Sequence, residues 1–193
     1  AEVLIGDICD RGVCERAAVE IDGVVHLAAQ TGVIPSIEDP IGDLEVNGVG
    51  SLNILQACVR NDVKSIVCAS SNAVAGSNDP PIHEDMLLRP KSPYGASKLL
   101  MESYCHAFSE TFDVNTKIVR FANIYGPGSR KKGSVVAQFI KNALNHRPLN
   151  IYGDGQQTMD MIFGGDIGAA NVAALDNEEC KNIFLNVGTG IQT

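Results

Sequence analysis

The sequence predicts an α/β fold built on a doubly wound parallel sheet, with helices on both faces. Short apolar runs alternate along the chain with longer amphipathic segments. These runs are hydrophobic at almost every position, as is typical of strands that are buried on both faces. Hydrophobic residues make up 45% and charged residues 20% of the 193 residues, which is ordinary for a globular chain and excludes a disordered one.

The individual elements follow from the spacing of the apolar residues. Four strands are predicted, over residues 3–5, 23–27, 65–69 and 117–120. Four helices are predicted, over residues 11–20, 43–61, 94–112 and 135–145. Ser92 is suited to cap the third of these helices, and Pro93 fits its first position. From residue 148 onward the elements are shorter and glycine is more frequent, so we expect a small second lobe there.

Charge and composition exclude several classes of function. Lys and Arg number 15 and Asp and Glu 23, which gives a net charge of −8. An acidic chain is poorly suited to nucleic acids or anionic membranes, so we expect neither among its partners. The six cysteines form no C-x-x-C pair and the histidines show no metal-ligand spacing, which predicts reduced thiols, a cytoplasmic protein and no metal site. We interpret His26, inside an apolar run, as a hydrogen-bonded core residue.

The strongest chemical signal is a Tyr-x-x-x-Lys spacing at the start of a predicted helix, formed by Tyr94 and Lys98. Residues four apart lie on one helix face, about one turn from each other. The ammonium of Lys98 should favour the tyrosinate and lower the pKa of Tyr94 from its usual value of about 10. The phenol would then be a usable general base. For an isolated match of this kind, an exposed helical pair is the alternative.

Residues that could bind a nucleotide follow several of the predicted strands. Ligands of such sheets bind beyond the carboxyl ends of the strands. Ser70 and Ser71 follow one strand and would place a hydroxyl beside Tyr94, whereas Asp7 would accept a hydrogen bond from an adenine amino group. The small Ala28–Ala29 pair would let a diphosphate approach the backbone. Turn formation, helix entry and simple packing are the alternatives for these residues taken singly.

Together these motifs resemble the extended short-chain dehydrogenases/reductases, in particular the NAD-dependent nucleotide-sugar epimerase/dehydratase group, with a UDP-glucose 4-epimerase-like pattern. The matching strings run through the whole chain. They include residues 6–10, 25–30, 47–55, 70–76, 92–98, 120–127, 151–155 and 186–190, and Asp166.

The resemblance implies NAD-dependent epimerisation of a nucleotide sugar, a UDP-hexose or UDP-uronate at C4, by transient hydride transfer through a 4-keto intermediate. Tyr94 would take the proton of a sugar hydroxyl, Lys98 would hold the nicotinamide ribose and Ser71 would orient the hydroxyl. Contacts to NAD are implied for Asp7, Ile8, Leu27, Ala28, Ala29, Thr31, Asn47, Ala69, Ser70, Tyr94, Lys98 and Phe121. Contacts to the sugar nucleotide are implied for Ser71, Asn123, Val136 and Tyr152.

The sequence also departs from the family pattern. The family opens with a strand, a GxxGxxG turn, a helix and a second strand, and this sequence has no such glycine-rich turn. We therefore expect a chain truncated at both ends: residues 1–147 as an incomplete Rossmann-like NAD-binding domain that lacks its first βαβ unit, and residues 148–193 as part of a substrate lobe with a returning sheet strand. Strand 3–5 would lack its neighbour, and the next strand would expose unpaired backbone groups.

Single residues depart from the family pattern as well. Met159 stands where an arginine that pairs with the nucleotide diphosphate is common, Ala75 replaces a tyrosine and Ile34 replaces a basic residue. The missing turn and Met159 motivate a second hypothesis, a degenerate non-catalytic relative that binds a nucleotide or a partner protein.

The family resemblance is also compatible with a nucleotide-sugar reductase or a nucleotide-sugar dehydratase. A dehydratase would need an acid and a base just after Ser71, where Asn72 and Ala73 stand, so dehydration is disfavoured. Family members usually pair through two long helices, so we expect a homodimer that forms through residues 43–61 and 94–112.

Overall fold

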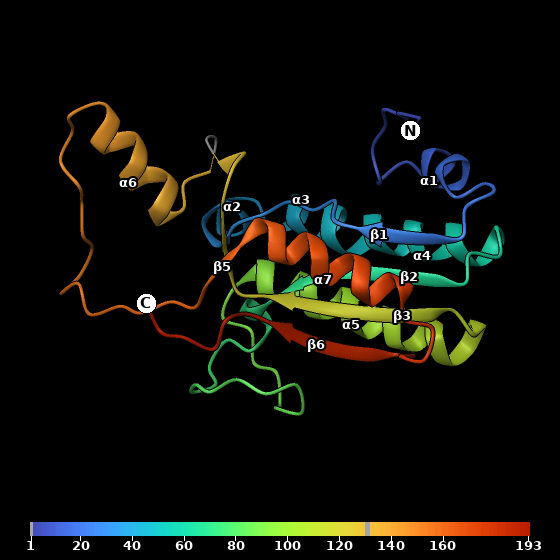
Figure 1. Cartoon of the computed structure of the whole chain (residues 1–193). Coiled ribbons are helices and arrows are strands. Elements are labelled where there is room, and N and C mark those ends of the chain that lie inside the picture. Colours follow the sequence, from blue (N-terminus) through green and yellow to red (C-terminus); the bar gives the residue numbers. More distant parts are fainter. Residues whose placement is uncertain (1, 130–131) are drawn as a thin grey trace.

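A four-stranded parallel sheet forms the centre of the fold (Figure 1). The computed structural model describes residues 2–129 and 132–193. The sheet strands, in spatial order, are β1 (Gly23–His26), β2 (Ser65–Ser71), β3 (Asn115–Phe121) and β6 (Ile183–Val187). All three neighbouring pairs are parallel. A separate parallel pair joins β4 (Asn123–Tyr125) to β5 (Met161–Phe163).

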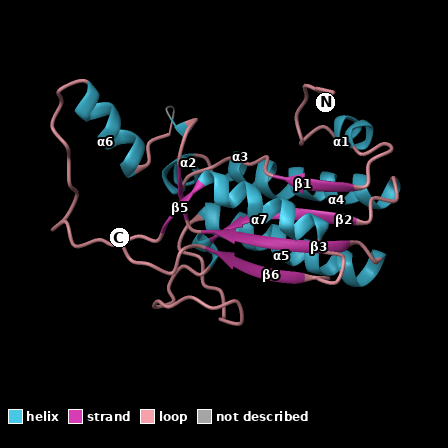
Figure 2. Ribbon diagram, in the orientation of Figure 1, coloured by secondary structure: helices cyan, strands magenta, loops and turns pink. Residues whose placement is uncertain are grey.

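Helices cover both faces of the sheet (Figure 2). On one face lie α1 (Arg11–Ala17), α4 (Ser51–Arg60) and α5 (Pro93–Phe112), and on the other lies α7 (Gly164–Asp176). Successive strand residues point to opposite faces, so Ile66 and Cys68 pack under α4 and α5 whereas Val67 and Ala69 pack under α7. The predicted fold class, an α/β fold with a parallel sheet between two helical layers, is confirmed.

The remaining helical segments lie at the carboxyl ends of the strands or beyond them. They are α2 (Val33–Glu38), α3 (Pro40–Leu44), the π-helical segment η1 (Glu45–Gly50), the short η2 (Asn72–Val74) and α6 (Val135–Leu144). The helix predicted over residues 43–61 is thus divided by a π-helical stretch. In Figure 1, α6 lies apart from the sheet. Within the predicted range 148–193, α7 packs on the sheet and β6 is one of its strands, as the predicted returning strand requires. None of the described helices is long and apolar enough to span a membrane.

The predicted strand over residues 3–5 is wrong. Val3 and Ile5 are 82% and 92% exposed, and the segment pairs with no strand in the described part of the chain. An extended apolar segment becomes a strand only where a neighbouring backbone satisfies its hydrogen bonds. As predicted, the outer edge of β1, the next predicted strand, is unpaired among the described strands. The other three predicted strands are present, with ends that differ by at most two residues.

A buried ion pair joins α5 to the sheet. Arg120 on β3 donates from Nε and Nη2 to the two carboxylate oxygens of Glu102, at 3.0 and 2.8 Å. The Ser70 hydroxyl donates to the same carboxylate, and the guanidinium lies 5.1 Å from the ring centre of Phe184. Arg120 and Glu102 are 4% and 1% exposed. A buried pair of this kind is tolerated because its geometry is bidentate and its remaining atoms are hydrogen-bonded.

Breaking this pair should destabilise the fold strongly. Glu102→Gln leaves the Arg120 charge buried without a counter-ion, which should cost about 3–5 kcal/mol of unfolding free energy in urea titrations. Replacing both partners with apolar side chains, as in E102L/R120M, should recover much of this loss. As a control, Glu15→Gln in the exposed Arg60–Glu15 pair should change stability by less than about 1 kcal/mol. Equal stabilities of E102Q and E15Q would contradict the prediction.

The interpretation of His26 as a satisfied core residue is confirmed. His26 is 4% exposed and its Nε2 lies 2.9 Å from the Ser51 hydroxyl. Because Ser51 donates its own proton to the Asn47 carbonyl at 2.6 Å, we assign the proton of this contact to Nε2. Burial, with a smaller contribution from the Lys98 charge, lowers the pKa of His26 from 6.5 to about 4.

Stability should therefore depend on pH through His26. Between pH 6.5 and 4 the unfolded chain binds a proton at His26 that the folded chain does not, so stability falls as the pH falls through this range. The loss should approach about 3 kcal/mol at the acid end. His26→Gln keeps an N–H donor for Ser51 but does not titrate. Between pH 6.5 and 4, the unfolding free energy of this variant should therefore fall by about 3 kcal/mol less than that of the wild type. If the unfolding free energies of H26Q and the wild type change with pH to the same extent, the lowered pKa of His26 is refuted.

Candidate functional site

The three predicted catalytic residues lie together at the carboxyl edge of the sheet. Ser71 ends β2, while Tyr94 and Lys98 occupy the first and second turns of α5. The Ser71 side chain lies close enough to the Tyr94 phenol to lower its pKa. Lys98 is 3% exposed, and its Nζ donates to the carbonyl of Ala69 at 2.9 Å. The helix face that carries Tyr94 and Lys98 is thus attached to the end of β2.

The start of α5 is fixed by side chains from two elements. Ser92 caps the helix and accepts the N–H of Gly95 at 3.1 Å, and Pro93 has no N–H to satisfy. The N–H of Tyr94 donates to the hydroxyl of Ser36, on α2, at 3.0 Å. The predicted cap at Ser92 is confirmed, whereas the contact from Ser36 was not foreseen.

Burial shifts the two titratable groups of the site in opposite directions. It raises the pKa of Tyr94 above 10, to which Asp43 adds, while the hydrogen bond from Ser71 lowers it. Burial lowers the pKa of Lys98, and nearby Cys68, Asp43, Cys105 and Glu102 oppose this shift. The prediction that Lys98 lowers the pKa of Tyr94 is therefore wrong for this structure. The ammonium is directed to the Ala69 carbonyl, and burial of the phenol outweighs the other influences.

A buried polar cluster links the loop after β1 to the helices. Asn47, in η1, is 0% exposed and bonds both backbone groups of Gln30, accepting its N–H at 2.9 Å and donating to its carbonyl at 3.0 Å. Its amide also donates to Asp43 at 3.1 Å and to Ser97 at 3.2 Å, and Ser97 donates to Asp43. The polar atoms of Asn47 thus hold protein groups, and its predicted contact to NAD stays a prediction.

The residues predicted to contact the adenine of NAD lie just before α1, and those predicted to line its diphosphate and ribose lie just after β1. Asp7 accepts the N–H of Cys9 at 2.8 Å, and Asn53 on α4 donates to the carbonyl of Ile8 at 3.0 Å. Leu27, Ala28, Ala29 and Thr31 follow β1, and Leu27 is 57% exposed. Backbone and side chains here are therefore open to a ligand, as a nucleotide site requires.

Several of the predicted residues are committed to contacts within the protein. Ser70 is 3% exposed and bonded to Glu102, and Phe121 is 8% exposed and packed in the core with Ile162 and Ile167. Asn123 donates from its amide to the carbonyl of Asp160 at 3.3 Å.

Two of the residues predicted to contact the sugar nucleotide, Val136 and Tyr152, lie outside the strands of the sheet. Val136 lines a cavity of about 430 Å³ beside α6, which lies apart from the sheet in Figure 1. Tyr152 is 82% exposed. The predicted contacts of Val136 and Tyr152 to the sugar nucleotide stay predictions.

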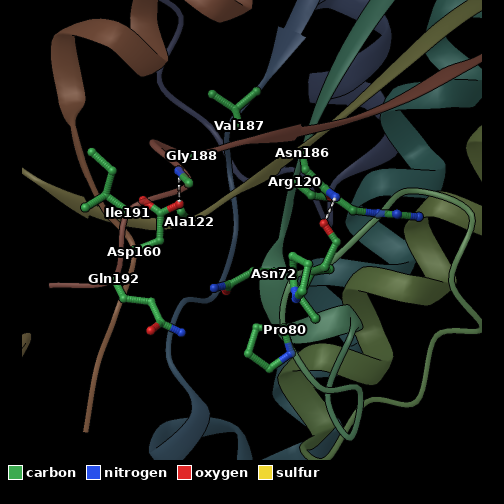
Figure 3. Close-up of a pocket in the computed structure, with 13 residues that line it drawn as sticks. Asn72, Pro80, Arg120, Ala122, Asp160, Asn186, Val187, Gly188, Ile191 and Gln192 are labelled. Atoms are coloured by element: carbon green, nitrogen blue, oxygen red, sulfur yellow. Dashed lines mark hydrogen bonds between the residues drawn. The ribbon is translucent and has the colours of Figure 1, made fainter.

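A larger cavity, of about 750 Å³, lies beside the end of β6 (Figure 3). Asn72, next to Ser71, lines it together with Arg120, Asp160 and Asn186. The carboxylate of Asp160 accepts the N–H groups of Thr189 and Gly190 at 2.9 and 2.8 Å. Burial raises the pKa of Asp160, but a hydrogen bond from the Thr189 hydroxyl and these two from the backbone outweigh it, and the net shift is downward. Asp160 thereby fixes the turn that closes one wall of the cavity.

Several residues around the site were missed at the level of sequence. Glu102 lies four residues after Lys98 and eight after Tyr94, so it shares their helix face, and this spacing was sufficient to find it. Asp43, Ser36 and Asp160 act through contacts across long stretches of chain, for which the sequence gives no local signal.

Comparison with known proteins agrees with this geometry. Residues 1–188 match the sequence model of the NAD dependent epimerase/dehydratase family. The chain belongs to this family. The resemblance inferred from the motifs is thereby confirmed.

Individual members of the family are similar over nearly the whole chain. The putative UDP-glucose 4-epimerase of Methanocaldococcus jannaschii is 37% identical over 198 residues, which cover 100% of this chain and 64% of that protein. The UDP-glucuronic acid 4-epimerase of Bacillus cereus, solved with UDP-glucuronic acid and NAD, has a TM-score of 0.91 and 32% identity over 97% of this chain and 60% of that one. The UDP-glucose 4-epimerase of Thermotoga maritima, solved with UDP-glucose, has a TM-score of 0.92 and 32% identity over 97% of this chain and 62% of that one. The chain spans less than two thirds of the length of each.

The contact between Ser71 and Tyr94 can be tested by titration. Because the Ser71 hydrogen bond lowers the pKa of the phenol, Ser71→Ala should raise the pKa of Tyr94 further. The phenol is followed by ultraviolet difference titration, with Tyr94→Phe subtracted to isolate its signal. An unchanged or lowered pKa in S71A would show that the hydroxyl does not stabilise the phenolate.

Proposed function

We propose that this protein is an enzyme, an NAD-dependent 4-epimerase of a UDP-hexose or a UDP-uronate. The observation that carries the proposal is the placement of Lys98 and Tyr94, one helix turn apart, with Ser71 beside the phenol at the carboxyl edge of a parallel sheet. Ligands of such sheets bind at this edge. The bound molecules of the similar structures, NAD and UDP sugars, support the same class of ligands here.

The residues present fit the nicotinamide-ribose end of NAD. Lys98 Nζ can donate three hydrogen bonds, and within residues 2–129 and 132–193 it makes one, to Ala69. A buried ammonium with donors to spare is suited to the hydroxyls of a ribose. The backbone of Ala28 and Ala29, beyond β1, would line the diphosphate. We further propose that residues 1–147 form the NAD-binding domain and residues 148–193 part of a substrate lobe.

In this mechanism Tyr94 transfers the proton, Ser71 orients the substrate hydroxyl and Lys98 holds the cofactor. NAD, when bound, would supply the hydride acceptor and donor for the sugar carbon. Tyr94 accepts the proton of the C4 hydroxyl and later gives it back, while Ser71 holds that hydroxyl in line. Lys98 would hold the nicotinamide ribose beside the phenol, on which burial disfavours a negative charge. The neutral Asn72 and Ala73 after Ser71 supply no acid–base pair, so elimination of water is not favoured.

Two further features of the proposal concern assembly and location. We propose a homodimer that forms through η1, α4 and α5, because Leu44 and Val49, beside and within η1, are 41% and 49% exposed.

We also propose that the protein is cytoplasmic. Its four buried cysteines, Cys14, Cys58, Cys68 and Cys105, are free thiols, as is usual in a reducing compartment.

Turnover should depend on Tyr94 and Lys98. The purified product of the complete gene should release NAD on denaturation and interconvert UDP-galactose with UDP-glucose or UDP-galacturonate with UDP-glucuronate. Tyr94→Phe and Lys98→Met should each lower kcat by about 100-fold or more, because the first removes the group that transfers the proton and the second the group that holds the cofactor ribose. Tyr104→Phe, on an exposed part of the same helix, is the matched control and should keep full activity.

Two outcomes would overturn parts of this proposal. Full activity in Y94F would remove Tyr94 from its assigned role. A wild-type protein that holds no NAD and turns over neither sugar pair with added NAD would instead favour a non-catalytic nucleotide-binding relative.

A further inference from the structure

Ser36 bonds the backbone of Tyr94 from outside the helix that carries Tyr94. It lies in α2 and is 0% exposed. Its hydroxyl donates to the carbonyl of Val33 at 2.7 Å and accepts the backbone N–H of Tyr94 at 3.0 Å. The two residues are 58 positions apart in the sequence. A short helix beyond β1 is thus bonded to the backbone of the proposed proton-transfer residue.

The first turn of α5 shows what this contact supplies. The first N–H groups of a helix have no partner within it and need an acceptor from elsewhere. Here Pro93 has no N–H, and the N–H groups of Gly95 and Ala96 are accepted by the side chain and carbonyl of Ser92. The N–H of Tyr94 is accepted by Ser36 instead. Tyr94 is therefore held by a group outside its own helix, whereas its neighbours are held by the cap.

The position of α2 shows which segment of the protein this contact connects to Tyr94. The helix begins directly after residues 28–31, the proposed diphosphate-binding segment, and Gly32 makes the turn between them with a φ of +113°. Gly32 can adopt this conformation at little cost because it has no Cβ. Within the segment, the side chain of Asn47 is hydrogen-bonded to both backbone groups of Gln30. The segment is thus tied to η1 at Gln30 and, through Ser36, to Tyr94.

We propose that Ser36 is a positioning residue: it fixes the backbone of Tyr94 relative to the cofactor-binding segment after β1. This inference rests on the proposed function, because positioning matters only if Tyr94 transfers the proton. The alignment of reacting groups is worth large rate factors, so a small displacement of the phenol lowers turnover without removing any reacting group.

The test compares Ser36→Ala with a matched serine on α5. S36A should lower kcat by about 10- to 100-fold with the KM for the sugar nucleotide nearly unchanged, because the loss is confined to alignment. Ser36→Thr keeps the hydroxyl and should restore much of kcat. Ser103→Ala is the control, because Ser103 donates to the Leu99 carbonyl on the exposed side of the same helix, and it should behave as wild type.

A second measurement needs neither NAD nor substrate. Backbone amide exchange of Tyr94, followed by NMR, should accelerate at least tenfold in S36A relative to amides at the far end of α5, because its acceptor is lost. Wild-type kcat in S36A, or an equal change of exchange along the whole helix, would overturn the proposal and leave Ser36 a packing residue. Faster exchange at Tyr94 in S36A, when the wild-type protein turns over no sugar, would keep the contact but refute the proposed function. If S36A does not fold, Ser36→Cys, with a weaker acceptor, takes its place with the same expectations.

Discussion

The buried ion pair between Arg120 and Glu102 sets how α5 lies on the sheet, and the candidate site depends on that placement. Tyr94, Lys98 and Glu102 follow one another at four-residue intervals on a single helix face. Glu102 is bonded to Ser70 and Lys98 to Ala69, so two successive turns of the helix are attached to two successive residues of β2. Ser71, the last residue of β2, lies near Tyr94 in the first turn of the same helix. The rotation of one helix and the end of one strand thus fix the pair of groups that would do the chemistry.

The helical layer that contains α5 buries several further polar side chains. Besides the ion pair, the carboxylate of Asp43 is 1% exposed and accepts hydrogen bonds from Asn47 and Ser97. Buried charges and amides contribute little net stability, and each would be costly if its partners moved. What such a network provides is a single arrangement in which every group is satisfied. In this protein that arrangement joins α3, η1 and α5 to the loop after β1, which are the elements that surround the site.

The sequence predicted the parts of this structure that depend on local pattern. The helix at residues 94–112 and its cap at Ser92 follow from spacing and capping chemistry, and the structure places the helix at Pro93–Phe112. The strand predicted at residues 3–5 fails because a strand needs a neighbour, and no local pattern reports one. The helix α2 was missed because six residues are too few to show a period, and the role of Ser36 depends on a residue 58 positions away. Glu102 was within reach of the spacing argument that found Lys98.

The sign of the Tyr94 shift shows why burial must be known before a pKa is assigned. The Tyr-x-x-x-Lys spacing predicts a lowered phenol pKa, but burial penalises the phenolate and the ammonium alike, raising the pKa of Tyr94 and lowering that of Lys98. Each shift favours the neutral form of its own group, so burial alone works against an ionised pair. In this arrangement the phenol keeps its proton, and the ammonium is satisfied in part by Ala69. A substrate hydroxyl placed between Ser71 and Tyr94 adds a donor to the phenol, and donors stabilise a phenolate. Proton acceptance by Tyr94 would thus require that hydrogen bonds donated to the phenol, from Ser71 and from the substrate hydroxyl, first lower its pKa so that it releases its own proton.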